Sequence, residues 1–164
     1  MAAQDRSALE AWKSIVGLVR GLAEGLSDEE LDRGRAKSGM TIRETVHHVA
    51  EANVVGASIV VAALGSPGCV FDWSWMMPFG KWMERLSYDR KPIAPALRLI
   101  EALNAYVVAQ VEPLADGLDR IVRLRDEPGA EPHAVSVAEV LLQEADHARQ
   151  HVEEARALRG ARAK

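Results

Sequence analysis

Apolar residues recur every three or four positions along four long stretches of this chain, and that period is typical of amphipathic α-helices. The pattern predicts helices over residues 7–25, 41–64, 93–112 and 136–160. Three of these stretches begin with a Ser or Thr that is followed three residues later by Glu, which is the spacing of a capping box. The three predicted boxes are Ser7 with Glu10, Thr41 with Glu44, and Ser136 with Glu139.

The segments between the helices carry few strand signals, so an all-α fold is the simplest interpretation. Residues 27–33 (SDEELDR) are typical of one extra helical turn, and residues 121–125 (IVRLR) could form a short extended piece. We find no pair of strands strong enough to build a sheet. Four amphipathic helices in a chain of 164 residues therefore predict one four-helix-bundle domain over residues 1–164.

One connection, residues 66–92, is much longer than the few residues that usually join bundle helices. It is a crossover between the second and third long helices, and it holds three of the four tryptophans and both phenylalanines. Aromatic side chains at this density must pack against something. We expect the crossover to seal one end of the bundle, or to form a wall of a ligand pocket or a dimer contact. Trp73, Trp75 and Trp82 are accordingly candidate substrate-binding residues.

Composition excludes several classes of partner. The net charge is −4 and no Lys/Arg-rich block occurs before the tail, which argues against nucleic-acid binding. The most apolar run, residues 54–64, is shorter than the roughly 20 residues of a membrane span, so we expect no membrane partner. The first residues do not resemble a secretory signal, and Cys69 is the single cysteine. A cytoplasmic protein with a small-molecule substrate is the expectation.

Candidate chemistry lies in the last predicted helix. His147 and His151 are four residues apart, and Glu144 lies one turn before them, so the three side chains share one face at the edge of the apolar stripe. Two imidazoles spaced in this way can bind one transition metal ion if a third ligand exists. His47 or His48, on the second long helix, could supply it. The alternative is that these histidines hydrogen-bond to nearby carboxylates or lie half-exposed at the rim.

Two motifs and the order of the elements resemble a known family. The stretch TIRETVHHVAEA is similar to the second helix of the DinB/YfiT-like metal-binding superfamily, and VSVAEVLLQEADHARQH is similar to its last helix. The resemblance assigns the metal-binding histidines to His48, His147 and His151. The chain departs from the family pattern in the doubled His47-His48, the Trp-rich crossover and an Asp before His147.

The resemblance implies a divalent metal, with zinc or nickel most expected, held by three histidines with water in the remaining positions. An open site of this kind lowers the pKa of a bound water or thiol and creates a nucleophile near neutral pH. The family includes thiol-dependent transferases and isomerases, so a low-molecular-weight thiol co-substrate and a transferase, isomerase or hydrolase reaction are expected. The resemblance also implies a homodimer, because several members of the family form dimers. The position of Glu144 on the same helix face, and not the resemblance, suggests that it orients a ligand or acts as a base.

Two alternatives remain open at this stage. Glu44-x-x-His47 and Glu144-x-x-His147 repeat the motif of di-iron carboxylate bundles, although Glu44 already serves a predicted capping box. A non-enzymatic bundle is the other alternative, because an aromatic and Met-rich crossover is typical of adaptable binding surfaces. Such a protein would bind an apolar ligand, or form a dimeric scaffold, through the crossover. The residues concerned are Trp73, Trp75, Met76, Met77, Phe79 and Trp82.

Overall fold

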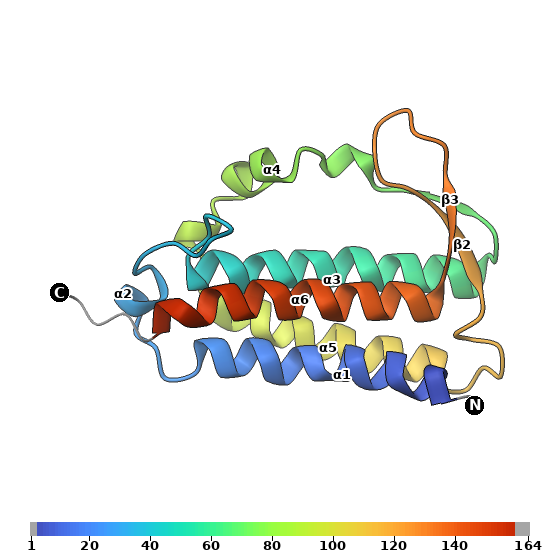
Figure 1. The fold of residues 1–164 in the computed structure, drawn as a ribbon, viewed down its shortest axis with the longest axis horizontal. Helices are drawn as coiled ribbons and strands as arrows, with labels where there is room; N and C mark the ends of the chain where they lie inside the picture. The colour runs from blue at the N-terminus through green and yellow to red at the C-terminus, as the bar shows by residue number, and fades with distance from the viewer. Residues whose placement is uncertain (1–2, 160–164) are drawn as a thin grey trace.

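A computed structural model describes residues 3–159, and four long helices dominate it (Figure 1). They are α1 (Ala3–Ala23), α3 (Ile42–Gly65), α5 (Ile93–Val111) and α6 (Val137–Arg159). Helix α1 packs against α6 and α5, and α3 packs against α5 and α6. The predicted all-α four-helix bundle, with its long crossover between the second and third long helices, is confirmed. The last residue of the predicted range 136–160 lies outside the described residues.

The capping predictions were correct at two helices and wrong at the third. Thr41 accepts from the Glu44 backbone N–H while the Glu44 carboxylate accepts from that of Thr41, and Ser136 and Glu139 make the same exchange. Ser7 lies inside α1, which already begins at Ala3. Its spacing to Glu10 also occurs within a continuous helix, and residues 3–6 (AQDR) do not interrupt one. After α1, Gly25 takes a left-handed conformation with φ of 74°.

Helix α2 (Asp28–Leu31) is the predicted extra turn, and it anchors the start of α3. The buried guanidinium of Arg43 donates to the carboxylates of Asp28 and Asp32 at 2.8 Å each, and to the carbonyl oxygen of Lys91 at 3.0 Å. These carboxylates raise the pKa of Arg43 further above its ordinary value. One side chain therefore ties the first turn of α3 to α2 and to the end of the crossover.

A small sheet corrects the expectation that no strands pair. Its strands are β1 (Val70–Asp72), β2 (Ile121–Arg125) and β3 (His133–Ser136), in the order β1-β2-β3. The β1–β2 pair is parallel and the β2–β3 pair is antiparallel. The strands have three to five residues each and come from segments far apart in the chain, which is too little local pattern to read. The sheet lies at the end of the bundle where α6 begins (Figure 1).

Residues 66–92 run from the sheet along the outside of α3 and α6 (Figure 1). After β1 they form the 3₁₀ turn η1 (Ser74–Met76), α4 (Phe79–Leu86) and a second turn η2 (Tyr88–Arg90). Met76 and Tyr88 of this segment are buried, and the Tyr88 ring stacks on His47 of α3. The crossover thus lies over one side of the bundle instead of sealing one end.

Helix α3 is the central helix of the fold. By length and hydropathy it is the one helix of the described residues that could cross a membrane, which is weak evidence because core helices share these properties. It packs against α1, α5 and α6, and it buries the polar side chains of Arg43, His47, His48 and Asn53. Because α3 contacts three other helices, its apolar composition is explained by packing inside the bundle.

Candidate metal centre

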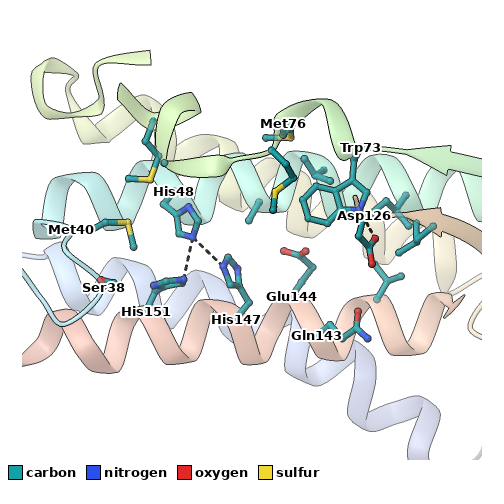
Figure 2. Close-up of a pocket in the computed structure, with 18 of the residues that line it drawn as sticks. Ser38, Met40, His48, Trp73, Met76, Asp126, Gln143, Glu144, His147 and His151 are labelled. Atoms are coloured by element: carbon teal, nitrogen blue, oxygen red, sulfur yellow. Dashed lines mark hydrogen bonds between the residues drawn. The ribbon is translucent and has the colours of Figure 1, made fainter. Parts of the chain in front are cut away.

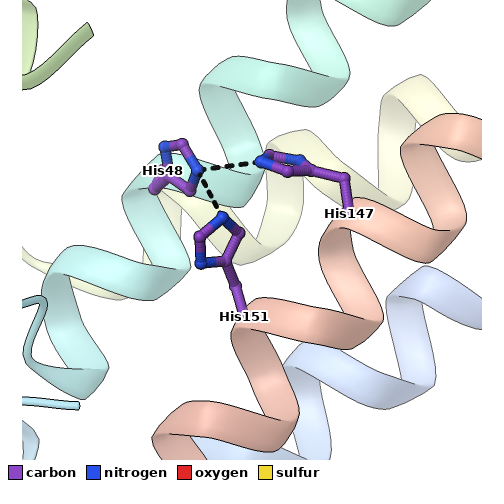
Figure 3. A group of neighbouring side chains, drawn as sticks. All are labelled: His48, His147 and His151. Atoms are coloured by element: carbon purple, nitrogen blue, oxygen red, sulfur yellow. Dashed lines mark hydrogen bonds between the residues drawn. The ribbon is translucent and has the colours of Figure 1, made fainter. Parts of the chain in front are cut away.

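Three imidazoles from two helices meet at one point on the inner side of the bundle (Figure 3). Nε2 of His48, on α3, lies 3.0 Å from Nε2 of His147 and 3.1 Å from Nε2 of His151, both on α6. One ligand atom from each residue lies within 4.8 Å of the other two. The structure therefore brings together the three histidines that the resemblance singled out, and we name them the histidine triad.

Local structure accounts for this convergence. His147 and His151 are one turn apart, so both rings leave α6 on the same side. The three rings stand nearly edge-to-face, with centroids 4.5 to 4.9 Å apart. His48 is almost fully buried, whereas His147 and His151 are half-buried. The triad is thus enclosed on the α3 side and reachable from a cavity on the other.

The triad histidines are held in their neutral form. Burial lowers the pKa of His48 to about 3 and that of His147 to about 4, and it also lowers the pKa of His151. The neighbouring imidazoles depress the values of His48 and His147 further, since a second positive charge at this distance is unfavourable. At neutral pH each ring therefore keeps a lone pair for a Lewis acid.

The spacing of the three nitrogens suits a metal ion. Nitrogens bound at the usual 2.0–2.1 Å to one ion lie about 2.9 Å apart in octahedral and about 3.3 Å apart in tetrahedral geometry. The observed 3.0 and 3.1 Å fall inside this range. Hydrogen bonding is a poorer explanation, because a single Nε2 proton on His48 cannot serve both contacts with good geometry. The donor set thus fits a divalent transition metal and leaves further coordination positions open.

His47 faces a different neighbourhood. Its ring stacks on Tyr88 with centroids 5.5 Å apart, and its Nε2 lies 3.3 Å from the carbonyl oxygen of Lys91. Spacing alone could not choose between His47 and His48, and the structure brings only His48 to the triad. The Glu44 carboxylate already accepts hydrogen bonds from the backbone N–H of Thr41 and, at 2.9 Å, from the guanidinium of Arg35. The two motifs of the di-iron alternative are therefore not brought together.

The triad opens into a cavity of about 620 Å³ between α3, α6 and the crossover (Figure 2). Its lining is mainly apolar and includes four methionines, Met40, Met76, Met77 and Met83. Trp73 lies in the wall at the opposite end from His151, where its indole Nε1 donates to Asp126 Oδ1 at 2.9 Å. The pocket-wall interpretation of the crossover therefore holds for this side of the bundle.

The other two candidate tryptophans lie elsewhere. Trp75 is 65% exposed, and its ring packs edge-to-face on Trp82 with centroids 5.1 Å apart. Neither is among the residues that line the cavity. Of the three predicted substrate-binding tryptophans, only Trp73 is thus in a position to touch a ligand in the cavity. Met76 and Met77 were among the crossover residues predicted for an apolar ligand, and both line the cavity, whereas Met40 and Met83 were not anticipated.

Glu144 lies inside the cavity, between the triad and Trp73 (Figure 2). Burial raises the pKa of its carboxyl to about 8, and the nearby amide of Asn53 opposes this shift. The Oε2 atom is shielded from solvent without a hydrogen bond of acceptable geometry. Gly56 makes room for the carboxyl, because a Cβ atom at that position would lie 2.8 Å from Glu144 Cγ. No sequence signal indicated this role for Gly56.

A helical bundle with three convergent histidines at the base of a cavity defines a class of candidate metal-binding proteins. Residues 14–155 match the family model of the DinB superfamily, and the chain belongs to that superfamily. A protein of Geobacillus kaustophilus, provisionally named a metal-dependent hydrolase, is 27% identical over 133 residues, which is 79% of this chain and 72% of that protein.

The fold also matches a solved structure. YfiT from Bacillus subtilis, described as a probable metal-dependent hydrolase with an unusual four-helix bundle topology, superposes with a TM-score of 0.79 at 17% sequence identity. The match covers 96% of this chain and 87% of YfiT. At this identity the likeness concerns the fold. It places the long crossover and the helix order of this chain in a known architecture.

Proposed function

We propose that this protein is a metal-dependent hydrolase of the DinB type, with one divalent metal ion held by His48, His147 and His151. The observation that carries the proposal is the convergence of three neutral Nε2 atoms, 3.0 and 3.1 Å apart, at the inner end of an apolar cavity. The names of the Geobacillus kaustophilus and Bacillus subtilis relatives agree with it. Zinc and nickel both suit imidazole ligands.

A divalent metal held by three imidazoles supplies Lewis acidity and lowers the pKa of water, or of a thiol, to near neutral. The protein residues supply the surroundings of that chemistry. Because burial keeps the three imidazoles unprotonated, the site is ready to bind metal at neutral pH. The methionine and aliphatic lining places apolar side chains around a substrate, and electrostatic interactions are stronger in such surroundings than in water.

Glu144 is the residue that we propose for proton transfer. Its carboxyl lies in the cavity on the side of α6 that carries the triad, where Gly56 of α3 leaves room for it and the amide of Asn53 lies nearby. A carboxyl whose pKa is raised to about 8 can hold or accept a proton near neutral pH, as a general acid or base requires. Orienting a ligand is the alternative role for this side chain.

A turnover assay tests the proposal. Untagged protein, stripped with chelator and reloaded with zinc or nickel, is assayed against a panel of chromogenic esters and amides, with and without small thiols. We expect hydrolysis that depends on the added metal and that falls at least about 100-fold in His151→Ala. Activity that survives complete metal removal contradicts a metal-dependent reaction. Metal-dependent activity only with an added thiol would make the protein a thiol transferase.

A further inference from the structure

The charges along the cavity are strongly one-sided. Two carboxylates line it, Glu144 and Asp126, and no Lys or Arg occurs among the lining residues in the part of the chain that the structure describes. The histidines of the triad are uncharged at neutral pH, and a metal ion would place positive charge only at their end. Away from the triad, the cavity thus offers a ligand the acidic side chain of Asp126 and the carboxyl of Glu144, which is mostly protonated in the empty cavity and which a bound cation would ionise.

The side chain of Glu144 fits into a space in this wall that Gly56 of α3 leaves free. A Cβ atom on Gly56 would approach its Cγ to 2.8 Å and its Cδ to 3.0 Å, so only glycine at that turn of α3 leaves space for the carboxyl. Asn53, on the same helix, is fully buried and its amide lies near the Glu144 carboxyl, whose Oε2 atom has no hydrogen-bond partner among the described residues. Buried polar atoms without partners cost free energy, and a ligand that donates to Glu144 would recover part of it.

Asp126 and Trp73 add a second acidic contact beyond Glu144 (Figure 2). The indole N–H of Trp73 holds one oxygen of Asp126 at 2.9 Å, while the other oxygen lies 3.6 Å from Nε2 of the exposed His133. A carboxylate beside an indole ring is a combination that favours a cation over a neutral or anionic group. The wall between these polar groups is apolar, with Val55, Ile59 and Leu124.

We propose, on the basis of the metal-dependent function above, that the substrate is an apolar amine whose ammonium group is received by Glu144, with Asp126 and Trp73 on the same side. Glu144 then has the ligand-orienting role named above and does not transfer the proton. Its apolar body then lies against the aliphatic and methionine side chains, and its reactive group points to the triad. An ammonium beside Glu144 favours the carboxylate form of that side chain. Substrates of the same size that carry a carboxylate at this end are excluded.

Calorimetric titration with three matched probes tests the charge preference. The probes are 3-phenylpropylamine, 3-phenylpropan-1-ol and 3-phenylpropanoate, which share one apolar body and differ only in the terminal group. In metal-free protein we expect the amine to bind about tenfold more tightly than the alcohol, and the carboxylate to bind most weakly. The zinc-loaded protein should keep the preference of amine over alcohol. Equal affinities for amine and alcohol, or tightest binding of the carboxylate to metal-free protein, overturn the proposal.

Variants assign the preference to Glu144. Glu144→Gln keeps the shape of the side chain and should lower the amine affinity about tenfold, with less than about a threefold change for the alcohol. Glu153→Gln makes the same change at an exposed position of α6 and should leave all three affinities unchanged. Gly56→Ala, checked for folding by circular dichroism, should displace the Glu144 carboxyl and abolish the preference. An unchanged preference in folded Glu144→Gln contradicts the assignment.

The two proposals fail in different ways. Metal content is measured on the same samples, so loss of the amine preference in a protein that binds one metal ion rejects the substrate class alone. Amine binding in a protein that takes up no metal leaves the amine site standing and rejects the metal-dependent reaction.

Discussion

His47 and His48 are neighbours in the sequence and have opposite surroundings in the fold. His47 lies against Tyr88 and the Lys91 carbonyl at the end of the crossover, where protein groups already occupy its ring face and its Nε2. His48 turns toward α6, where the Nε2 atoms nearest to its own belong to two further imidazoles (Figure 3). The same side chain therefore serves packing on one side of α3 and candidate metal chemistry on the other. What decides the role is the neighbouring element.

The largest expected difference between the two sides is in metal affinity. His48→Ala removes one of three ligands and should weaken zinc binding by at least about 100-fold, because two imidazoles make a poor site. His47→Ala should change the affinity by less than about threefold. Competition titration with a zinc-sensitive dye measures both values. Equal losses in the two variants would contradict the separation of roles.

The two substitutions should affect the free energy of unfolding in the reverse order, with the larger loss in His47→Ala. His47→Ala removes a stacked, hydrogen-bonded side chain from the contact between α3 and Tyr88, and we expect the free energy of unfolding to fall by about 1–2 kcal/mol. In metal-free protein, His48→Ala should cost less, because it also relieves the crowding of three imidazoles. Urea unfolding of the chelator-treated proteins measures both changes. A larger loss for His48→Ala would mean that the triad is a structural element.

The smallest effect is a pH dependence that is specific to the triad. The pKa of His147 is lowered to about 4 in the folded protein, against about 6.5 in the unfolded chain, so between these values the unfolded state binds a proton that the folded state does not. Stability contributed by neutral His147 is therefore present above pH 6.5 and lost as the pH falls. Relative to His147→Gln, metal-free parent protein should lose at most about 1.4 kcal/mol per pH unit below pH 6.

Urea unfolding at pH 7, 6 and 5 tests this slope. The comparison with His147→Gln cancels the groups that do not interact with His147, and the difference includes the effect of His147 on the pKa of His48. Glu144 contributes with the opposite sign, since its pKa is raised and its stabilisation declines as the pH rises toward 8. Parallel stability curves for parent and variant would contradict a His147 that is kept neutral by burial.

What the sequence could predict depended on the range of the interactions concerned. The four long helices and the caps at Thr41 and Ser136 follow from local periodicity and spacing, and the structure confirms them. The shared face of His147 and His151 is also local, because both residues lie on one helix. The sheet was missed because β1 and β2 pair across some fifty residues, with too few positions in each strand for a pattern.

Other features needed the tertiary structure. Spacing could not separate His47 from His48, since both flank the apolar stripe of α3 and only the positions of α6 and the crossover distinguish them. Trp73 and Trp75 are two residues apart, yet one lines the cavity and the other is exposed. The space that Gly56 leaves is filled by the side chain of Glu144, which lies on another helix. No local sequence pattern could therefore predict this contact. Ser7 shows the converse error, in which a local capping pattern occurs inside a continuous helix.

X-ray absorption spectroscopy of the zinc-loaded, untagged protein tests the central claim most directly, because it reports the ligands of the metal itself. We predict one zinc ion per chain with three imidazole nitrogens at about 2.0–2.1 Å, and the same spectrum in His47→Ala. Failure to bind one equivalent of zinc, or a spectrum with fewer than three imidazoles, would contradict a metal centre built from His48, His147 and His151.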